Sequence, residues 1–495
     1  MKIIGRICFT FLLLSCAAGV AGARPTEVKI TILSDSPPRV RVEGERDKGA
    51  TAWSFLNAYA SAFGLAARVE NLKLADAAGS PIPFRQVAPG EFTSDREATR
   101  FSYEVKLDPP TFISDAAHVS WLTKDRGLLM TADLLPLRLG GTRLLLTLPT
   151  GWNVFTNEET AELGSYVVPN AEDAVFAVGR DLRSKKVRAG RLAFTFVTAG
   201  EWAFGDGEAV EAAEEILKIY TEVTGVAPRD RAALFLLPPA GGGAGNTWSA
   251  ETRGGTVTLI SGRLPSKLAA LAQLNGALSH ELLHLWVPNG LALEGGYDWF
   301  YEGFTNYQAL RVGLRRGQLT FQDYLNAVGA AFDGYKAARG GGERSLPEAS
   351  RRRWSGANAF IYHKGMLVAA LYDLELMRQT AGKSSLEDVY RQIFRRHAAG
   401  SNRQEGNPVI IEALAAMPGM RDFTRRYVEG ASPVELAAAV SEYGLRIEPG
   451  GVRTRLAVVA SPERAQRELL RKLGYNEKQD AEARKLHQRM KPRLP

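Results

Sequence analysis

The sequence predicts a multidomain α+β protein, in which a β-sandwich-like N-terminal domain precedes a mixed sheet and a mainly α-helical lobe. Short apolar or alternating runs, separated by Pro, Gly, Asn and Asp, fill roughly the first 200 residues. From residue 206 the apolar residues begin to recur at helical spacing, and mostly helical character continues to about residue 442. The length of 495 residues allows two to four domains.

Residues 24–205 are predicted to form the N-terminal β domain. The runs at 28–33, 143–148 and 192–197 are typical of strands. A helix-like interruption is predicted at 53–67.

Residues 206–447 are predicted to form the second domain, and residues 448–495 a charged C-terminal extension. The second domain begins with a helix at 209–224 that has apolar residues on one face. An apolar strand at 232–237, a glycine-rich loop at 241–246 and a strand at 256–260 follow. The extension has helical patterns at 462–473 and 477–490.

The composition is that of an ordinary globular protein, with 45% hydrophobic and 23% charged residues. It excludes collagen-like, disordered and polytopic membrane proteins. The two cysteines, Cys8 and Cys16, both lie in the first twenty residues. A disulfide, a cysteine-ligated metal and a cysteine nucleophile are therefore excluded from the rest of the chain.

The first 23 residues have the pattern of a secretory signal peptide. Lys2 and Arg6 precede a short apolar stretch, and small residues at 21–23 provide a cleavage site. The alternative is a lipoprotein signal, in which Cys16 of the L-L-S-C segment at 13–16 is lipidated. Both patterns predict export, to a periplasmic or extracellular location. No later apolar run is long enough for a transmembrane segment.

The formal net charge of +8 makes the protein basic, but its arginines are spread along the chain. The short runs at 351–353 and 395–396 are interpreted as solvated helix surface rather than as a nucleic-acid patch. We therefore expect no nucleic-acid partner.

The strongest functional signal is H-E-L-L-H at 280–284, near the end of a helical run at 268–286. Residues four apart lie on one face of a helix, so His280 and His284 can bind a single zinc ion. Glu281 then lies beside the open coordination position, where it can take a proton from a metal-activated water. The alternative is a buried helix that carries two purely structural histidines.

A third zinc ligand is expected from W-F-Y-E-G-F-T at 299–305. Glu302 lies eighteen positions after His284, and aromatic residues flank it on both sides. Glu294 is the competing ligand, but its position in a loop gives it less rigid support. Two histidines, a glutamate and a water make a catalytic zinc site rather than a structural one.

The segment Y-H-K-G at 362–365 offers a donor for the oxyanion that forms during peptide hydrolysis. The phenol of Tyr362 is the candidate, because an O–H group can stabilise that negative charge. His363 is the alternative donor, and a tyrosine on a helix is also common in a core.

These three motifs together resemble the gluzincin metallopeptidases, and among them the glycyl aminopeptidase-like family. The resemblance covers about residues 206–445, including Y-V-E-G at 427–430 and Y-G-L at 443–445, and extends more weakly into the N-terminal domain. It implies a thermolysin-like catalytic domain and a peptide substrate. It also implies one zinc ion on His280, His284 and Glu302, with Glu281 as general base and Tyr362 as transition-state stabiliser.

Two features depart from the family pattern. Related aminopeptidases hold the substrate's free amine with a glutamate in a G-G-L-E-H-like segment beside the cleft. Here Gly243, Gly245 and Asn246 are the predicted substrate-binding residues, and nearby Glu251 can replace the missing carboxylate. The 50 residues after Leu445 are also too few for the PDZ domain that many members carry.

The sequence therefore predicts an exported zinc metallopeptidase, with aminopeptidase activity as the first hypothesis. The alternatives are a zinc endopeptidase with an altered amine site and an inactive zinc-containing binding protein. The presence of Glu281 argues against the inactive protein, because a structural zinc site needs no base.

Overall fold

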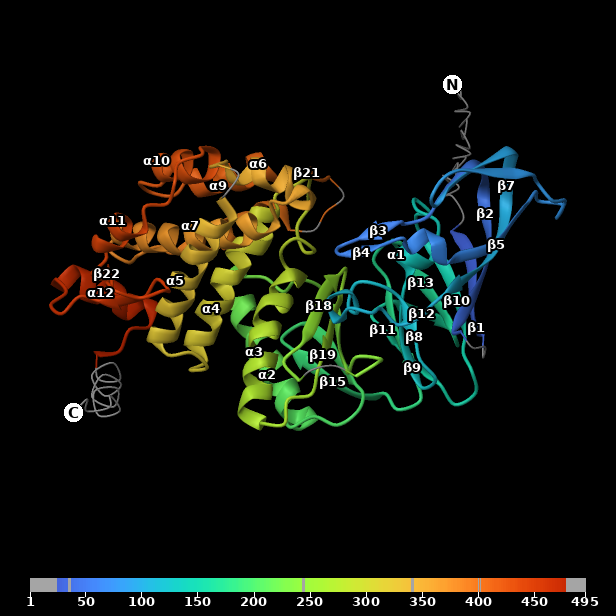
Figure 1. Ribbon diagram of the computed structural model, residues 1–495, viewed down its shortest axis with the longest axis horizontal. Helices are drawn as coiled ribbons and strands as arrows, with labels where there is room; N and C mark the ends of the chain where they lie inside the picture. Colours follow the sequence, from blue (N-terminus) through green and yellow to red (C-terminus); the bar gives the residue numbers. More distant parts are fainter. Residues whose placement is uncertain are drawn as a thin grey trace, which may run out of the picture.

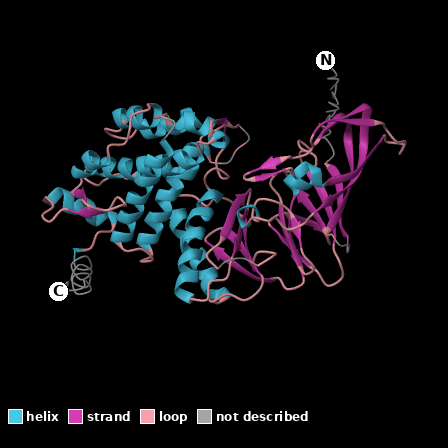
Figure 2. Cartoon of the chain, in the orientation of Figure 1, coloured by secondary structure: helices cyan, strands magenta, loops and turns pink. Residues whose placement is uncertain are grey.

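The computed structural model describes residues 25–33, 37–242, 245–339, 342–398, 400 and 402–477. Most strands lie in one half of the molecule and most helices in the other (Figure 2). The predicted signal peptide with Cys16 lies outside the described residues, as does nearly all of the helix predicted at 477–490. Within the described ranges, no helix is both long and apolar enough to cross a membrane.

The larger N-terminal sheet has eight strands, and the alternating run at 28–33 forms one of them as predicted. Val28 and Ile30 point into the core, whereas Lys29 between them is exposed. The strand order is β12 (Glu159–Glu162), β13 (Ser165–Val168), β10 (Thr142–Thr147), β1 (Thr26–Leu33), β2 (Arg39–Ser54), β7 (Glu91–Lys106) and β5 (Val69–Ala75), with β6 (Phe84–Ala88) also on β7.

A four-stranded sheet lies between the larger sheet and the second domain. Leu129 joins the core shared with the larger sheet, whereas Leu128 and Met130 pack against the sheet of the second domain. This period-2 alternation gives the small sheet two apolar faces. The predicted sandwich is thus confirmed. The strand order is β11 (Asn153–Thr156), β14 (Val175–Gly179), β9 (Arg126–Met130) and β8 (Trp121–Leu122), and the short helix α1 (Thr131–Leu134) follows β9.

The prediction of a helix at 53–67 was wrong. The segment holds the end of β2, a small hairpin of β3 (Ala58–Tyr59) and β4 (Ala62–Phe63), and the start of the 3-10 turn η1 (Leu65–Arg68). Ala60, in the hairpin turn, has a positive φ of 50°. The hairpin extends from the N-terminal domain toward the helical lobe (Figure 1).

The sheet of the second domain begins earlier in the chain than predicted. The run at 192–197 forms β16 (Leu192–Thr198), which pairs in parallel with β17 (Arg231–Leu237) and antiparallel with β15 (Arg183–Ala189). The boundary therefore lies before Arg183 and not at residue 205. The sequence shows the change to helical spacing but not which strands pair. The full order is β15, β16, β17, β19 (Thr256–Ser261) and β18 (Trp248–Arg253).

Helices cover the other face of this sheet and form the rest of the lobe, as predicted. Phe194, Phe196 and Leu234 on that face belong to the same apolar core as the helices. The helices are α2 (Asp206–Thr224), α3 (Lys267–Glu281), α4 (Thr305–Arg315), α5 (Phe321–Ala338), α6 (Leu346–Arg351), α7 (Asn358–Gln379), α8 (Leu386–His397), α9 (Gly406–Ala415), α10 (Arg421–Thr424) and α11 (Leu436–Ser441). Short elements between them include the 3-10 turns η3 (Leu282–Leu285) and η6 (Arg353–Ser355), the π-helical turns η4 (Trp299–Phe304) and η7 (Arg425–Glu429), and the paired strands β20 (Leu293–Glu294) and β21 (Gln404–Glu405). The 3-10 turn η2 (Ile113–Asp115) belongs to the N-terminal domain.

The described part of the C-terminal extension belongs to the helical lobe. The predicted boundary at residue 447 divides a hairpin of β22 (Leu445–Ile447) and β23 (Leu456–Val458). The helix predicted at 462–473 forms α12 (Arg464–Leu473), whose apolar face joins the core of the lobe. Arg311 of α4 also donates to the carbonyl of Leu473 at 2.8 Å.

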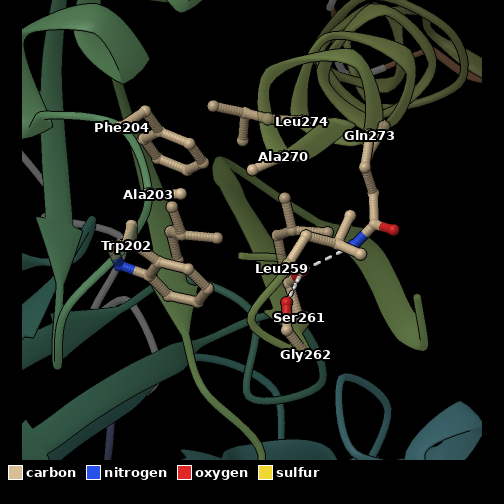
Figure 3. A pocket seen from close by; sticks show the side chains of 12 residues that line it. Trp202, Ala203, Phe204, Leu259, Ser261, Gly262, Ala270, Gln273 and Leu274 are labelled. Carbon is tan, nitrogen blue, oxygen red and sulfur yellow. Dashed lines mark hydrogen bonds between the residues drawn. The ribbon is translucent and has the colours of Figure 1, made fainter. Parts of the chain in front are cut away.

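Helix α3 packs closely against the sheet. Figure 3 shows the hollow between them, where Trp202 and Phe204 lie opposite Ala270 and Leu274. Its volume is about 10 Å³, enough for a single water at most. The sheet therefore supports α3, the helix whose C-terminal end carries the start of the H-E-L-L-H motif.

The turn η4 crosses α7 at a contact between two glycines. A Cβ added to Gly303 would lie 2.5 Å from the Cα of Gly365, and one added to Gly365 would lie 2.8 Å from the carbonyl oxygen of Trp299. These neighbours are backbone atoms, so a methyl group there must push the two elements apart. The motif glycines thus bring Glu302 and Tyr362, which precede them on the two elements, close together.

We predict that Gly365→Ala lowers the free energy of unfolding by about 1–3 kcal/mol, because it overpacks this crossing. Gly276→Ala in α3 is the control, since a Cβ there has no neighbour within 4 Å. The control is expected to leave stability unchanged or to raise it by up to about 1 kcal/mol, because alanine favours the helix. Urea unfolding of both variants measures the difference in stability. Equal unfolding midpoints would contradict the close contact between Gly303 and Gly365.

Candidate metal centre and active site

The predicted catalytic and metal-binding residues line one cavity of about 1670 Å³. The N-terminal domain contributes the β3–β4 turn to its wall, and the second domain contributes the edge strand β18 and helices α3, α4, α5 and α7. The predicted catalytic and metal-binding residues in this wall are His280, Glu281, His284, Glu302 and Tyr362.

The two histidines of the motif turn one ring nitrogen toward each other. Their Nε2 atoms are 3.1 Å apart. The Nδ1 of His284 lies 2.9 Å from the carbonyl oxygen of Val287, which can only accept, so Nδ1 carries the proton. The Nδ1 of His280 lies 3.0 Å from Oδ1 of Asn306. With both Nδ1 atoms as donors, both Nε2 lone pairs face the same point.

Glu302 completes this arrangement from η4. Its Oε2 lies 3.4 Å from Nε2 of His280 and 3.7 Å from Nε2 of His284. That oxygen is buried, and it makes no well-formed hydrogen bond to any described residue. Burial alone would raise the pKa of Glu302, but the contact with His280 and the charges of His284 and Arg353 lower it to about 2.

The three facing atoms fit a zinc ion. Ligand atoms at about 2.0–2.2 Å from a tetrahedral ion lie about 3.3–3.6 Å from one another, and the observed separations of 3.1, 3.4 and 3.7 Å scatter around that range. A bound cation would also give the buried Oε2 the partner it lacks. Nitrogen and carboxylate donors in this ratio suit zinc.

Glu294, the competing ligand, lies elsewhere. It is exposed in β20 and is not among the residues that line the cavity. The structure therefore brings Glu302 to the histidines and leaves Glu294 apart from them.

Glu281 lies at the edge of the metal centre. Its carboxylate and the two imidazoles present ligand atoms within 4.8 Å of one another. Its Oε2 accepts a hydrogen bond from the hydroxyl of Thr252 in β18 at 2.8 Å. This contact turns the carboxylate toward β18, whose residues Glu251 and Thr252 also line the cavity.

Tyr362 lies closer to the metal centre than His363 does. Its ring is nearly parallel to that of His280, with 6.4 Å between the ring centres. Burial and the nearby carboxylate of Glu302 raise the pKa of Tyr362, so its phenol keeps its proton. His363 also lines the cavity, but its ring packs against Gly334 of α5.

Glu251 lies on β18 and lines the same cavity. Its two oxygens accept hydrogen bonds from the hydroxyl of Tyr59 at 2.6 Å and from Nδ1 of His118 at 2.6 Å. Both donors belong to the N-terminal domain. Although burial opposes ionisation, the bond from His118 and the charge of Arg253 lower the pKa of Glu251 below its usual value.

The predicted loop residues do not share this position. Gly245 and Asn246 form a turn before β18 and are not among the residues that line the cavity. Gly243 lies outside the described residues. Glu251 was recognised in the sequence only as a substitute. Its role follows from its place in the edge strand β18, whose alternate residues face the N-terminal domain, and no local sequence pattern shows that place.

Arg353 is a site residue that the sequence did not indicate. The run at 351–353 was interpreted as solvated surface, and Arg351 and Arg352 are indeed exposed. Arg353 instead lines the cavity and donates to Oε1 of Glu302 at 2.9 Å. A three-residue run with no periodicity cannot show which member turns inward.

Residues 294–368 match the family model of the M61 glycyl aminopeptidases. The matched segment contains Glu302 and Tyr362 but begins after the H-E-L-L-H motif. Over this segment the chain is similar to the gluzincin peptidases. The chain is a peptide hydrolase, as the motifs predicted. A search of curated proteins finds no match.

Solved structures of peptidases share the fold of this chain. An aminopeptidase N family protein from Idiomarina loihiensis superposes with a TM-score of 0.71 at 18% identity, over 86% of this chain and 79% of that one. An M1 zinc metallopeptidase from Deinococcus radiodurans gives a TM-score of 0.53 at 16% identity, over 84% of this chain and 95% of that one. A mutant of that metallopeptidase, bound to a Tyr-Ser-Ala substrate, gives 0.52 at 14% identity over the same shares.

We predict that Glu302→Ala sharply lowers the zinc content of the purified protein, because it removes one of three converging ligand atoms. Glu294→Ala, which changes an exposed glutamate outside the cavity, is expected to retain one zinc ion per chain. Metal analysis after dialysis against a dilute chelator distinguishes the two variants. Equal zinc in both would show that Glu302 is not a ligand.

Proposed function

We propose that this protein is an exported zinc aminopeptidase, which removes the first residue of peptides that have a free amine. The observation that carries the proposal is the pairing, in one cavity, of the His280, His284 and Glu302 atoms with the ionised carboxylate of Glu251. The first group fits the metal that peptide hydrolysis needs, and the second fits a substrate ammonium group.

The residues around the metal divide the chemistry between them. Zinc bound by His280, His284 and Glu302 would acidify a water and polarise the scissile carbonyl. Glu281 takes the proton of the attacking water and gives it to the departing amine. The phenol of Tyr362, which keeps its proton, donates to the oxyanion.

The N-terminal domain favours an exopeptidase over an endopeptidase. Tyr59 of the β3–β4 turn and His118 bond to the carboxylate of Glu251, around which an endopeptidase would need room for substrate residues before the cleavage point. Tyr59 holds this turn in place through its bond to Glu251. The guanidinium carbon of Arg253 lies 4.4 Å from the centre of the Tyr59 ring. A substrate amine that reaches Glu251 can therefore extend no further in that direction.

Export is proposed from the signal pattern at residues 1–23 alone. Cleavage at that site would release a periplasmic or extracellular enzyme, whereas lipidation of Cys16 would anchor it. Mass spectrometry of the mature N-terminus distinguishes the two.

We predict that the protein cleaves peptides with free N-termini, leaves their N-acetylated forms intact, and loses activity in a chelator. Glu281→Gln is expected to lower kcat by about 10²–10⁴-fold without loss of zinc, because the amide cannot act as a base. Release of the first amino acid is measured by chromatography. Cleavage of acetylated peptides would indicate an endopeptidase, and bound zinc with no cleavage would indicate a binding protein.

We predict that Glu251→Gln lowers kcat/KM for free peptides by about 10–100-fold, because a neutral amide replaces a charged partner of the ammonium group. Asn246→Ala is the matched comparison, since Asn246 is the residue that the loop hypothesis assigns to substrate. It is expected to behave like the unchanged enzyme in steady-state kinetics. A lower kcat/KM in Asn246→Ala with an unchanged value in Glu251→Gln would instead assign the amine site to the loop.

A further inference from the structure

Arg353 lies where the third metal ligand meets the candidate oxyanion donor. Its side chain is 13% exposed, whereas that of its neighbour Arg352 is 61% exposed. We propose that Arg353 is a positioning residue, which fixes Glu302 as a one-oxygen ligand and holds the hydroxyl of Tyr362 beside the metal centre. The proposal rests on the metal centre of the proposed function, and its first measurement needs no peptide hydrolysis.

All three nitrogens of the Arg353 guanidinium donate hydrogen bonds. One terminal nitrogen donates to Oε1 of Glu302 at 2.9 Å and reaches the hydroxyl oxygen of Tyr362 at 3.4 Å. The other donates to Oδ1 of Asp298 at 2.7 Å, and Nε donates to Oδ1 of Asn358 at 3.1 Å. Because its planar fork is rigid, these contacts fix the direction of each bond.

The bond to Glu302 selects which carboxylate oxygen faces the metal. Oε1 is occupied by Arg353, so Oε2 is the oxygen that lies 3.4 Å and 3.7 Å from the two histidine nitrogens. Without Arg353 the carboxylate could rotate about its last bond, and the metal would have to restrain it. Outer partners of this kind commonly change metal affinity 10–100-fold.

Asp298 offsets the positive charge that Arg353 places beside the metal centre. A guanidinium beside a metal ligand would by itself repel a divalent cation. Asp298 is buried, pairs with Arg353, and also accepts a bond from the hydroxyl of Tyr301 at 2.6 Å. The pair of Asp298 and Arg353 thus provides directed donors with little net charge.

The same nitrogen that holds Glu302 also reaches Tyr362, so the ligand and the oxyanion donor share one support. Tyr362 accepts from Arg353 through its oxygen, so this contact does not use the phenolic hydrogen. Loss of Arg353 should therefore affect two measurable quantities, the zinc affinity and the rate at saturating zinc.

The test compares Arg353→Gln and Arg353→Lys with the matched control Arg352→Gln. Zinc affinity is measured by competition with a chromogenic chelator. We expect R353Q to bind zinc about 10–100-fold more weakly than R352Q, and R353K, which keeps the charge but loses the fork, to lie between them. At saturating zinc, R353Q should show a lower kcat for a free-amine tripeptide with nearly unchanged KM.

Zinc binding by R353Q as tight as that by R352Q would overturn the role at Glu302. An unchanged kcat at saturating zinc would overturn the role at Tyr362. Thermal unfolding is recorded for each variant, and if R353Q does not fold, R353K decides by the same two measurements. If the unchanged protein binds zinc but cleaves no peptide, the proposed function fails while the zinc affinities still test Arg353.

Discussion

The site depends on one buried negative charge, the carboxylate of Glu302. An ionised group in this surrounding is costly unless it is paired and hydrogen-bonded. Arg353 satisfies one of its oxygens, and the other oxygen faces two imidazole nitrogens. Asp298 in turn balances Arg353. In this arrangement Oε2 of Glu302 is the atom that still lacks a partner, and a divalent cation would supply one.

The fold holds this charge in place through close backbone contacts. The π-helical turn η4 carries Glu302, and its contact with α7 at Gly303 and Gly365 lets the two elements approach closely. On the opposite side, the small N-terminal sheet shares an apolar core with the sheet of the second domain. Tyr59 and His118 of the N-terminal domain also bond directly to Glu251, which gives this carboxylate a defined position in the cavity.

Much of the site could be predicted from the sequence because its geometry is local. The spacing of His280 and His284 depends only on one helical turn, and Glu302 lies in an aromatic segment that had to be buried. Glu251 and Arg353 depend on tertiary contacts, namely the edge position of β18 and the turn after α6, which no local pattern encodes. The domain boundary at residue 205 failed for the same reason, because strand pairing of β15 and β16 with β17 is not visible in hydrophobic periodicity.

The central claim is that three side-chain atoms share one zinc ion. Diffraction from zinc-loaded crystals at the zinc absorption edge tests it most directly. The structure predicts one anomalous peak, about 2.0–2.2 Å from Nε2 of His280, Nε2 of His284 and Oε2 of Glu302. An ion held without Glu302, or Glu302 turned away from the histidines in the loaded protein, would contradict the account.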